Sequence, residues 1–91
     1  QSILAVVAET FNINADVLKG KKRAARINHA RQIAMFLARE MTEASLPQIG
    51  DFFGRSHTTV LHGCNKVEEE IEADTVLSSR IQRLRNQISS G

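Results

Sequence analysis

The segment from Arg26 to Glu43 constrains the fold more than any other, because its apolar residues recur every three or four positions. These residues are Ile27, Ala30, Ile33, Ala34, Leu37 and Met41. Only a long amphipathic helix places such a set on one side, where it can be buried. The sequence therefore predicts one long central helix that the rest of the chain covers.

Shorter stripes with the same spacing lie on both sides of this segment. Near the start, Ser2 can cap a helix that ends near Asn12, and a short helical turn follows that carries Val17 and Leu18 inward. A last helix, predicted at about 75–89, has the stripe Leu77, Ile81, Leu84 and Ile88. A chain of 91 residues is enough for one compact domain and too little for two. We expect a single all-α domain over residues 1–91, with about five or six helices.

Two helix starts in succession predict a helix-turn-helix at about residues 45–71. Ser45 followed by Gln48 is a capping box, and Pro47 in the first turn lacks only an N–H that would have been unpaired anyway. Gly54 ends this short helix, and Ser56 can cap the next one. The stripe of that second helix is Val60, Cys64, Val67 and Ile71.

The second helix opens with small polar side chains, namely Ser56, His57, Thr58 and Thr59. A recognition helix enters the major groove end-on, so only its first turn reaches the base edges. Hydroxyls and imidazole can donate or accept there, and a threonine methyl can pack on a thymine methyl. Helix capping alone would explain the same residues, so the pattern indicates DNA binding only together with nearby cations.

The charges are unevenly distributed, although the formal net charge is only +2. Residues 19–39 include seven basic and no acidic side chains, and residues 68–74 include five acidic and no basic ones. A charge run is often only a solvated helix face. A dipolar arrangement of this kind can also attract a phosphate backbone and orient the domain as it approaches. Residues 19–26 lack apolar periodicity, so we expect a basic loop there.

Three stretches carry a resemblance to a known family. Residues 46–67 read LPQIGDFFGRSHTTVLHGCNKV, residues 21–23 read KKR, and residues 30–35 read ARQIAM. Together they resemble the C-terminal DNA-binding domain of the bacterial replication initiator family DnaA, and the similarity covers essentially the whole chain. It implies a Trp repressor-like (TrpR-like) helical fold and binding to double-stranded DnaA boxes of the TTATCCACA type at a replication origin.

The resemblance also implies which residues touch DNA. Arg23 corresponds to the arginine that family members insert into the minor groove, and Ser56, His57, Thr58 and Thr59 correspond to major-groove base contacts. The expected backbone contacts are Lys21, Lys22, Arg31, Arg39, Ser45, Leu46, Pro47, Arg55, His62 and Lys66. Arg31 and Arg39 also lie off the apolar stripe of the central helix, so both are expected to face a DNA backbone.

The chain departs from the family pattern at the turn. Many members read FGGRDH, whereas residues 53–57 read FGRSH, which is one glycine shorter and has Ser56 in place of aspartate. The shorter turn should be tighter. Serine can still accept a hydrogen bond from a cytosine amino group but discriminates less than aspartate.

Other functions find less support in the sequence. His57 and His62 lie about 140° apart around a helix, so they cannot share a metal ion. No phosphate-binding glycine loop or nucleophile–base pair is visible, which argues against an enzyme. The resemblance implies that the family's ATP site lies in another domain, so no cofactor is expected here. A helical protein-interaction module that uses the Leu77–Ile88 stripe is the main alternative. A membrane role for the basic central helix is a weaker one.

The remaining expectations concern cellular context. One cysteine excludes an internal disulfide, the apolar runs are too short for a membrane span, and no signal peptide is visible. The start at Gln1 suggests a fragment of a longer protein. We expect a cytoplasmic, nucleoid-associated domain whose partners are double-stranded DNA, the rest of a DnaA chain and, weakly, acidic phospholipids.

Overall fold

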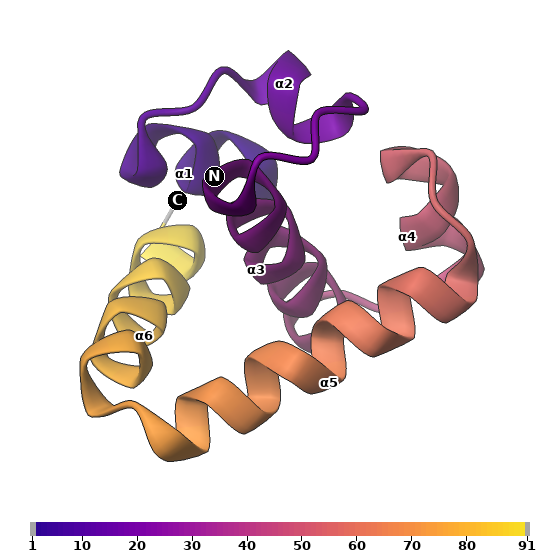
Figure 1. Ribbon diagram of the computed structural model, residues 1–91. Helices are drawn as coiled ribbons and strands as arrows, with labels where there is room; N and C mark the ends of the chain where they lie inside the picture. Colours follow the sequence, from indigo (N-terminus) through magenta and orange to yellow (C-terminus); the bar gives the residue numbers. More distant parts are fainter. Residues whose placement is uncertain (1, 91) are drawn as a thin grey trace.

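The computed structural model describes residues 2–90, and nearly all of them lie in six helices (Figure 1). The helices are α1 (Ile3–Phe11), α2 (Ala15–Lys19), α3 (Ala25–Met41), α4 (Leu46–Phe53), α5 (His57–Ala73) and α6 (Thr75–Ser90). Residues 2–90 contain no β-strand. The prediction of an all-α fold is therefore confirmed.

Helix α3 lies at the centre and packs against α1, α2, α4 and α5, whereas α6 packs against α1 and α5 (Figure 1). The predicted stripe of α3 is the core: Ala30, Ile33, Ala34 and Leu37 are fully buried. The helix ends at Met41 rather than Glu43, because Thr42 adopts an extended backbone and donates its hydroxyl to the Ala38 carbonyl. The Thr42 hydroxyl oxygen then accepts from the Ala44 N–H at 3.1 Å, which directs the chain toward α4.

Both caps of the predicted helix-turn-helix are present. Ser45 Oγ accepts from the Gln48 N–H at 3.2 Å, and Gln48 Oε1 accepts from the Ser45 N–H at 2.8 Å, which is a complete capping box. Ser56 Oγ accepts from the Thr59 N–H at 3.2 Å and starts α5. Both α4 and α5 therefore begin at the residue that the sequence predicts.

The turn between α4 and α5 depends on two glycines. Gly54 has a φ of +66°, in the left-handed region that glycine adopts at little cost. Gly50 lies one turn earlier, and its carbonyl accepts from the Arg55 N–H at 2.8 Å. A Cβ atom on Gly50 would lie 2.4 Å from the Arg55 carbonyl oxygen. The turn is therefore tight because α4 has no side chain where the connecting segment crosses it.

Helix α6 packs its apolar stripe into the core. Ile81 and Leu84 are buried, and Leu77 and Ile88 lie half-buried against the same cluster. On its outer side, Arg85 donates two hydrogen bonds to the Glu40 carboxylate, at 2.6 and 2.9 Å. The stripe that the interaction-module alternative required is thus already occupied.

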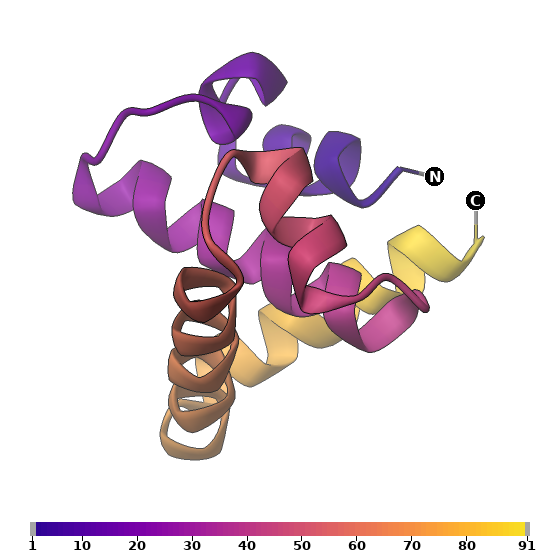
Figure 2. The same ribbon diagram turned by 90° about the vertical axis from the view of Figure 1, so that its right-hand side faces the viewer.

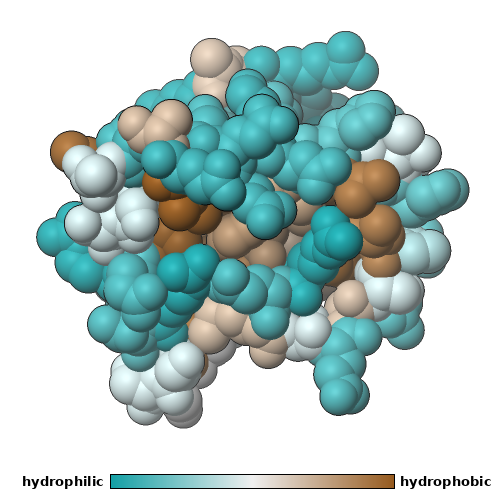
Figure 3. All heavy atoms as spheres, turned by 90° about the horizontal axis from the view of Figure 1, so that it is seen from below, coloured by the Kyte–Doolittle hydropathy of each residue, from teal (hydrophilic) through white to brown (hydrophobic). Residues whose placement is uncertain are grey.

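The surface seen from the side of α5 and α6 is mostly hydrophilic, with hydrophobic side chains confined to small patches (Figure 3). Across residues 2–90, the largest exposed hydrophobic side chains are Phe52 and Val76. None of the helices described has both the length and the apolar character needed to cross a bilayer.

Candidate nucleic-acid interface

The first turn of α5 is open to solvent. Ser56, His57, Thr58 and Thr59 are all exposed, as a base-reading role would need. Ser56 Oγ and Thr59 Oγ1 lie 3.0 Å apart and share a hydrogen bond, in addition to the cap that Ser56 forms. Within residues 2–90, His57 and Thr58 make no side-chain hydrogen bond, so they can offer their polar atoms to a ligand without breaking a cap.

The basic loop, residues 20–24 between α2 and α3, lies beside the start of α5. In Figure 2 the loop and the beginning of α5 are on the same side of the molecule. A single hollow there is lined by Lys21, Arg23, Asn28, Gly54, Arg55, Ser56 and Thr59, and we call it the loop–helix groove. Two segments at least 26 residues apart in sequence therefore form one polar and cationic surface.

Asn28 was not among the predicted site residues, although it lines the loop–helix groove. It lies in the first turn of α3. Its position shortly after the basic loop is the available signal in the sequence, but a pattern of positive charges does not indicate an uncharged amide.

The remaining predicted contacts differ in how accessible they are. Lys22, Ser45, Pro47, His62 and Lys66 are exposed, and Leu46 is half-buried. Arg55 is also half-buried, and its Nη1 donates to the Phe53 carbonyl at 2.6 Å, so part of this guanidinium stabilises the turn. Within residues 2–90, the side chains of Lys22, His62 and Lys66 make no hydrogen bond, whereas the Ser45 hydroxyl forms the cap of α4.

Arg31 does not lie where the sequence predicts. Its side chain is fully buried, with 0 % of the residue exposed, and its guanidinium donates to carbonyl oxygens of α2. Burial, together with the charge of Arg55, lowers the pKa of Arg31 from its ordinary value. The expectation that Arg31 faces a DNA backbone is wrong for this structure, because α2 covers the side of α3 that the helical periodicity left open.

Arg39 is exposed but belongs to a different hollow, on the side of α3 and α5 away from the basic loop. That hollow also contains Glu40, Cys64, Glu68 and Glu72. Burial raises the pKa of the Cys64 thiol, and Arg39 partly offsets this effect. Arg23, Arg31, Arg39 and Lys66 therefore do not line one continuous surface, and the predicted contact of Arg39 with DNA stays a prediction.

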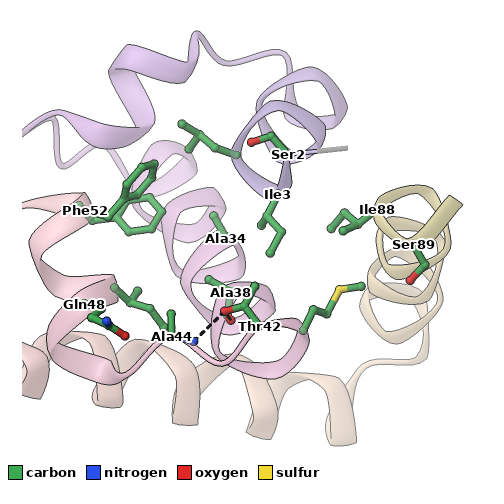
Figure 4. Close-up of a pocket in the computed structure, with 14 residues that line it drawn as sticks. Ser2, Ile3, Ala34, Ala38, Thr42, Ala44, Gln48, Phe52, Ile88 and Ser89 are labelled. Atoms are coloured by element: carbon green, nitrogen blue, oxygen red, sulfur yellow. Dashed lines mark hydrogen bonds between the residues drawn. The ribbon is translucent and has the colours of Figure 1, made fainter. Parts of the chain in front are cut away.

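In the part of the chain that the structure describes, neither a metal cluster nor an apolar hollow offers a second site for a charged ligand. Across residues 2–90, no three histidine, cysteine or acidic side chains come together as metal ligands would. A further hollow of about 650 Å³ lies between α1, α3, α4 and α6 (Figure 4). Its walls are mainly apolar, including Ile3, Phe52 and Ile88, and none of its lining residues is charged. It therefore offers nothing to a polyanion.

The capped exposed start of α5, the tight turn before it and the adjoining basic loop define the class: this is a helix-turn-helix domain with an accessory loop. Comparison with known proteins leads to the particular family. A family model described as the bacterial DnaA protein helix-turn-helix matches residues 1–67. The chain belongs to this family.

Curated relatives agree with the family model. The chain is similar to the chromosomal replication initiator protein DnaA of Treponema denticola, with 54% identity over 87 residues that cover 94% of this chain. It is also similar to the proteins of that name from Lactobacillus delbrueckii subsp. bulgaricus (48% over 87 residues, 94% of this chain) and Treponema pallidum (45% over 89 residues, 97% of this chain). The chain spans 19% of the length of each of these relatives.

Proposed function

We propose that this domain binds double-stranded DNA at DnaA boxes of the TTATCCACA type in a bacterial replication origin, and so supports initiation of chromosomal replication. The start of α5 reads the major groove, and Arg23 of the basic loop enters the adjacent minor groove. The observation that carries the proposal is the loop–helix groove, because it brings Lys21 and Arg23 next to Ser56 and Thr59.

The chemistry of this surface suits a duplex. B-DNA has a major groove about 12 Å wide, which admits one helix, and its minor groove is about 6 Å wide, which admits an extended arginine side chain. The exposed N-terminus of α5 carries partial positive charge that favours a phosphate. Lys21, Lys22 and Lys66 are exposed and add cations around the reading surface.

The four residues at the start of α5 are expected to contribute unequally. Ser56 and Thr59 already share a hydrogen bond and complete the cap, so the freest groups are His57 and Thr58. Thr58 can offer a methyl to thymine and a hydroxyl to a neighbouring base edge. We therefore place most of the major-groove readout on His57 and Thr58.

Fluorescence anisotropy at fixed salt tests the proposal by comparing a duplex that carries the box with a scrambled duplex. The wild-type chain should prefer the box, and Arg23→Ala and Thr58→Ala should each weaken binding to the box by about 1–3 kcal/mol with little effect on the scrambled duplex. Equal affinities of the wild-type chain for the two duplexes would refute sequence-specific binding.

Two further variants serve as controls for the type of contact. Lys66→Ala should weaken binding to both duplexes alike and lower the salt dependence by about one counterion, as loss of a phosphate contact does. Arg83→Ala removes an exposed arginine of α6 that lies in a hollow with Thr10 and Arg80, remote from the loop–helix groove. It should change neither affinity.

A further inference from the structure

Arg31 is a buried charged side chain of α3 that donates two hydrogen bonds to main-chain carbonyls of α2. Its Nε donates to the Leu18 carbonyl at 2.6 Å, its Nη2 to the Val17 carbonyl at 3.1 Å, and its Nη1 lies 3.5 Å from Asn28 Oδ1. A guanidinium in the interior costs more than an apolar side chain of similar size unless its donors are satisfied. Here each of the three guanidinium nitrogens has an acceptor, and two of these acceptors are main-chain carbonyls of α2.

The two carbonyl acceptors belong to the last turn of α2 (Ala15–Lys19), whereas Asn28 lies on α3 itself. The Val17 carbonyl also accepts from the Gly20 N–H at 3.1 Å, at the start of the basic loop. Carbonyls in the last turn of a helix lack partners within the helix and carry partial negative charge. A buried arginine that donates to two of them fixes the end of α2 against α3. The basic loop leaves α2 at this point and enters α3 at Ala25, six residues before Arg31.

The loop itself has little else to hold it. Within residues 2–90, no backbone hydrogen bond outside the helices involves Lys21, Lys22 or Arg23. All three side chains are exposed. The position of Arg23 therefore depends on the two ends of the loop. Arg31 joins α2, at the first end, to α3, at the second.

A second contact connects the same end of α2 with the helix-turn-helix. The Lys19 ammonium lies over the Phe52 ring of α4, 4.5 Å from its centroid, and Phe52 packs edge-on against the buried Phe53. An ammonium over an aromatic face at a surface contributes about 0.5–1 kcal/mol. The end of α2 is thus bonded to α3 and also touches α4, which precedes the recognition turn.

We propose that Arg31 is a positioning residue: by bonding the end of α2 to α3 it sets the distance between Arg23 and the start of α5, so that both grooves are read at once. This inference rests on the proposed two-groove binding. If the loop were free to move, Arg23 would have to be ordered during binding. The loss of conformational entropy would then make the binding free energy for the box less favourable.

The test is a double-mutant cycle with Arg31→Met and Arg23→Ala, measured by anisotropy on the box and the scrambled duplex. Arg31→Met keeps the volume but removes every hydrogen bond to α2. It should lower affinity for the box at least about fivefold, the lower end expected for one base-reading contact. Affinity for the scrambled duplex and its salt slope should stay unchanged, since no phosphate contact is lost.

The cycle distinguishes positioning from direct contact. If Arg31 acts through the loop, Arg31→Met should have almost no further effect once Arg23 is alanine. Additive losses, or a salt slope lowered by about one on both duplexes, would overturn the proposal in favour of an independent phosphate contact. Wild-type failure to prefer the box would instead refute the proposed function, and this inference with it.

Controls separate positioning from loss of fold. Arg85→Met removes another arginine that bonds two helices, through Glu40, on the side away from the loop, and it should leave box binding unchanged. Circular dichroism checks that Arg31→Met is folded. If it is not, Phe52→Leu breaks the exposed contact with Lys19, and it should give a smaller, box-only loss that also disappears in the Arg23→Ala background. A loss that persists in that background would contradict the proposal.

Discussion

At the scale of single residues, the turn between α4 and α5 shows how two glycines can be required for different reasons. Gly54 is needed for its backbone conformation, since nothing lies within 4 Å of the position its Cβ would take. Gly50 is needed for space, because the backbone of Arg55 lies where its Cβ would be. The two kinds of requirement predict different responses to alanine.

We expect Gly54→Ala to lower the free energy of unfolding by about 1–2 kcal/mol, the cost of a left-handed residue that has a Cβ. Gly50→Ala should cost more, because the main chain of Arg55 must shift to relieve a 2.4 Å contact. Urea denaturation of both variants measures the difference. Gly54→Asn is the matched control, since asparagine tolerates this conformation and should recover part of the stability. Equal losses for Gly54→Asn and Gly54→Ala would contradict the conformational explanation.

At the scale of helices, the sequence predicted those features that depend on neighbours along the chain. The stripes of α3, α5 and α6, the caps at Ser45 and Ser56 and the end at Gly54 follow from spacing and local hydrogen bonding, and all are present. Arg31 could not be predicted in this way. Helical periodicity shows which side of α3 is apolar, but it does not show that a five-residue helix covers the next side with its carbonyls.

In the candidate site, too, the features that depend on neighbouring residues could be predicted from the sequence, whereas those that depend on long-range packing could not. The exposed polar start of α5 could be predicted because it depends only on the cap and on the residues of the first helical turn. The loop–helix groove could not, because Arg23 and Thr59 are brought together by the packing of α2 on α3 and α4. The role of Asn28 in lining that groove depends on the same long-range packing.

A capping prediction belongs to this scale. Ser45→Ala removes the acceptor of the Gln48 N–H and disrupts the reciprocal pair that starts α4, so it should cost about 1 kcal/mol of stability. For a domain of this size that corresponds to a fall in Tm of about 4–8 °C. Differential scanning calorimetry measures it. Ser79→Ala, at an exposed position inside α6 that forms no cap, is the control and should not lower Tm, because alanine has the higher helix propensity. A Ser45→Ala Tm equal to that of the wild-type chain would show that the cap contributes nothing.

At the scale of the whole molecule, charge is separated along α5. Its start adjoins the basic loop, and its second half carries Glu68, Glu69, Glu70 and Glu72 beside α6 (Figure 1). Glu70 Oε1 lies 3.1 Å from His29 Nε2, within hydrogen-bond distance, whereas the Glu69 side chain is exposed. The acidic half should repel a duplex and favour approach of the basic end.

We expect Glu69→Gln to raise affinity for any duplex at low salt, without changing the preference for the box. Glu69 is about 16 Å along the helix axis from Thr58, at 1.5 Å per residue. That distance exceeds the Debye length of about 8 Å at physiological ionic strength, so the gain should fade as salt is raised. Anisotropy titrations across a salt series measure it. Glu9→Gln on α1 makes the same change of net charge elsewhere, and an equal gain from it would show that location on α5 is irrelevant.

The basic loop should make the free domain sensitive to proteolysis at one place. It places Lys21, Lys22 and Arg23 in succession on a stretch whose main chain makes no hydrogen bond to the rest of residues 2–90. Trypsin cleaves after such residues and prefers unbonded surface segments. Limited digestion should therefore nick the free domain between α2 and α3 first, and a bound duplex should protect that peptide bond.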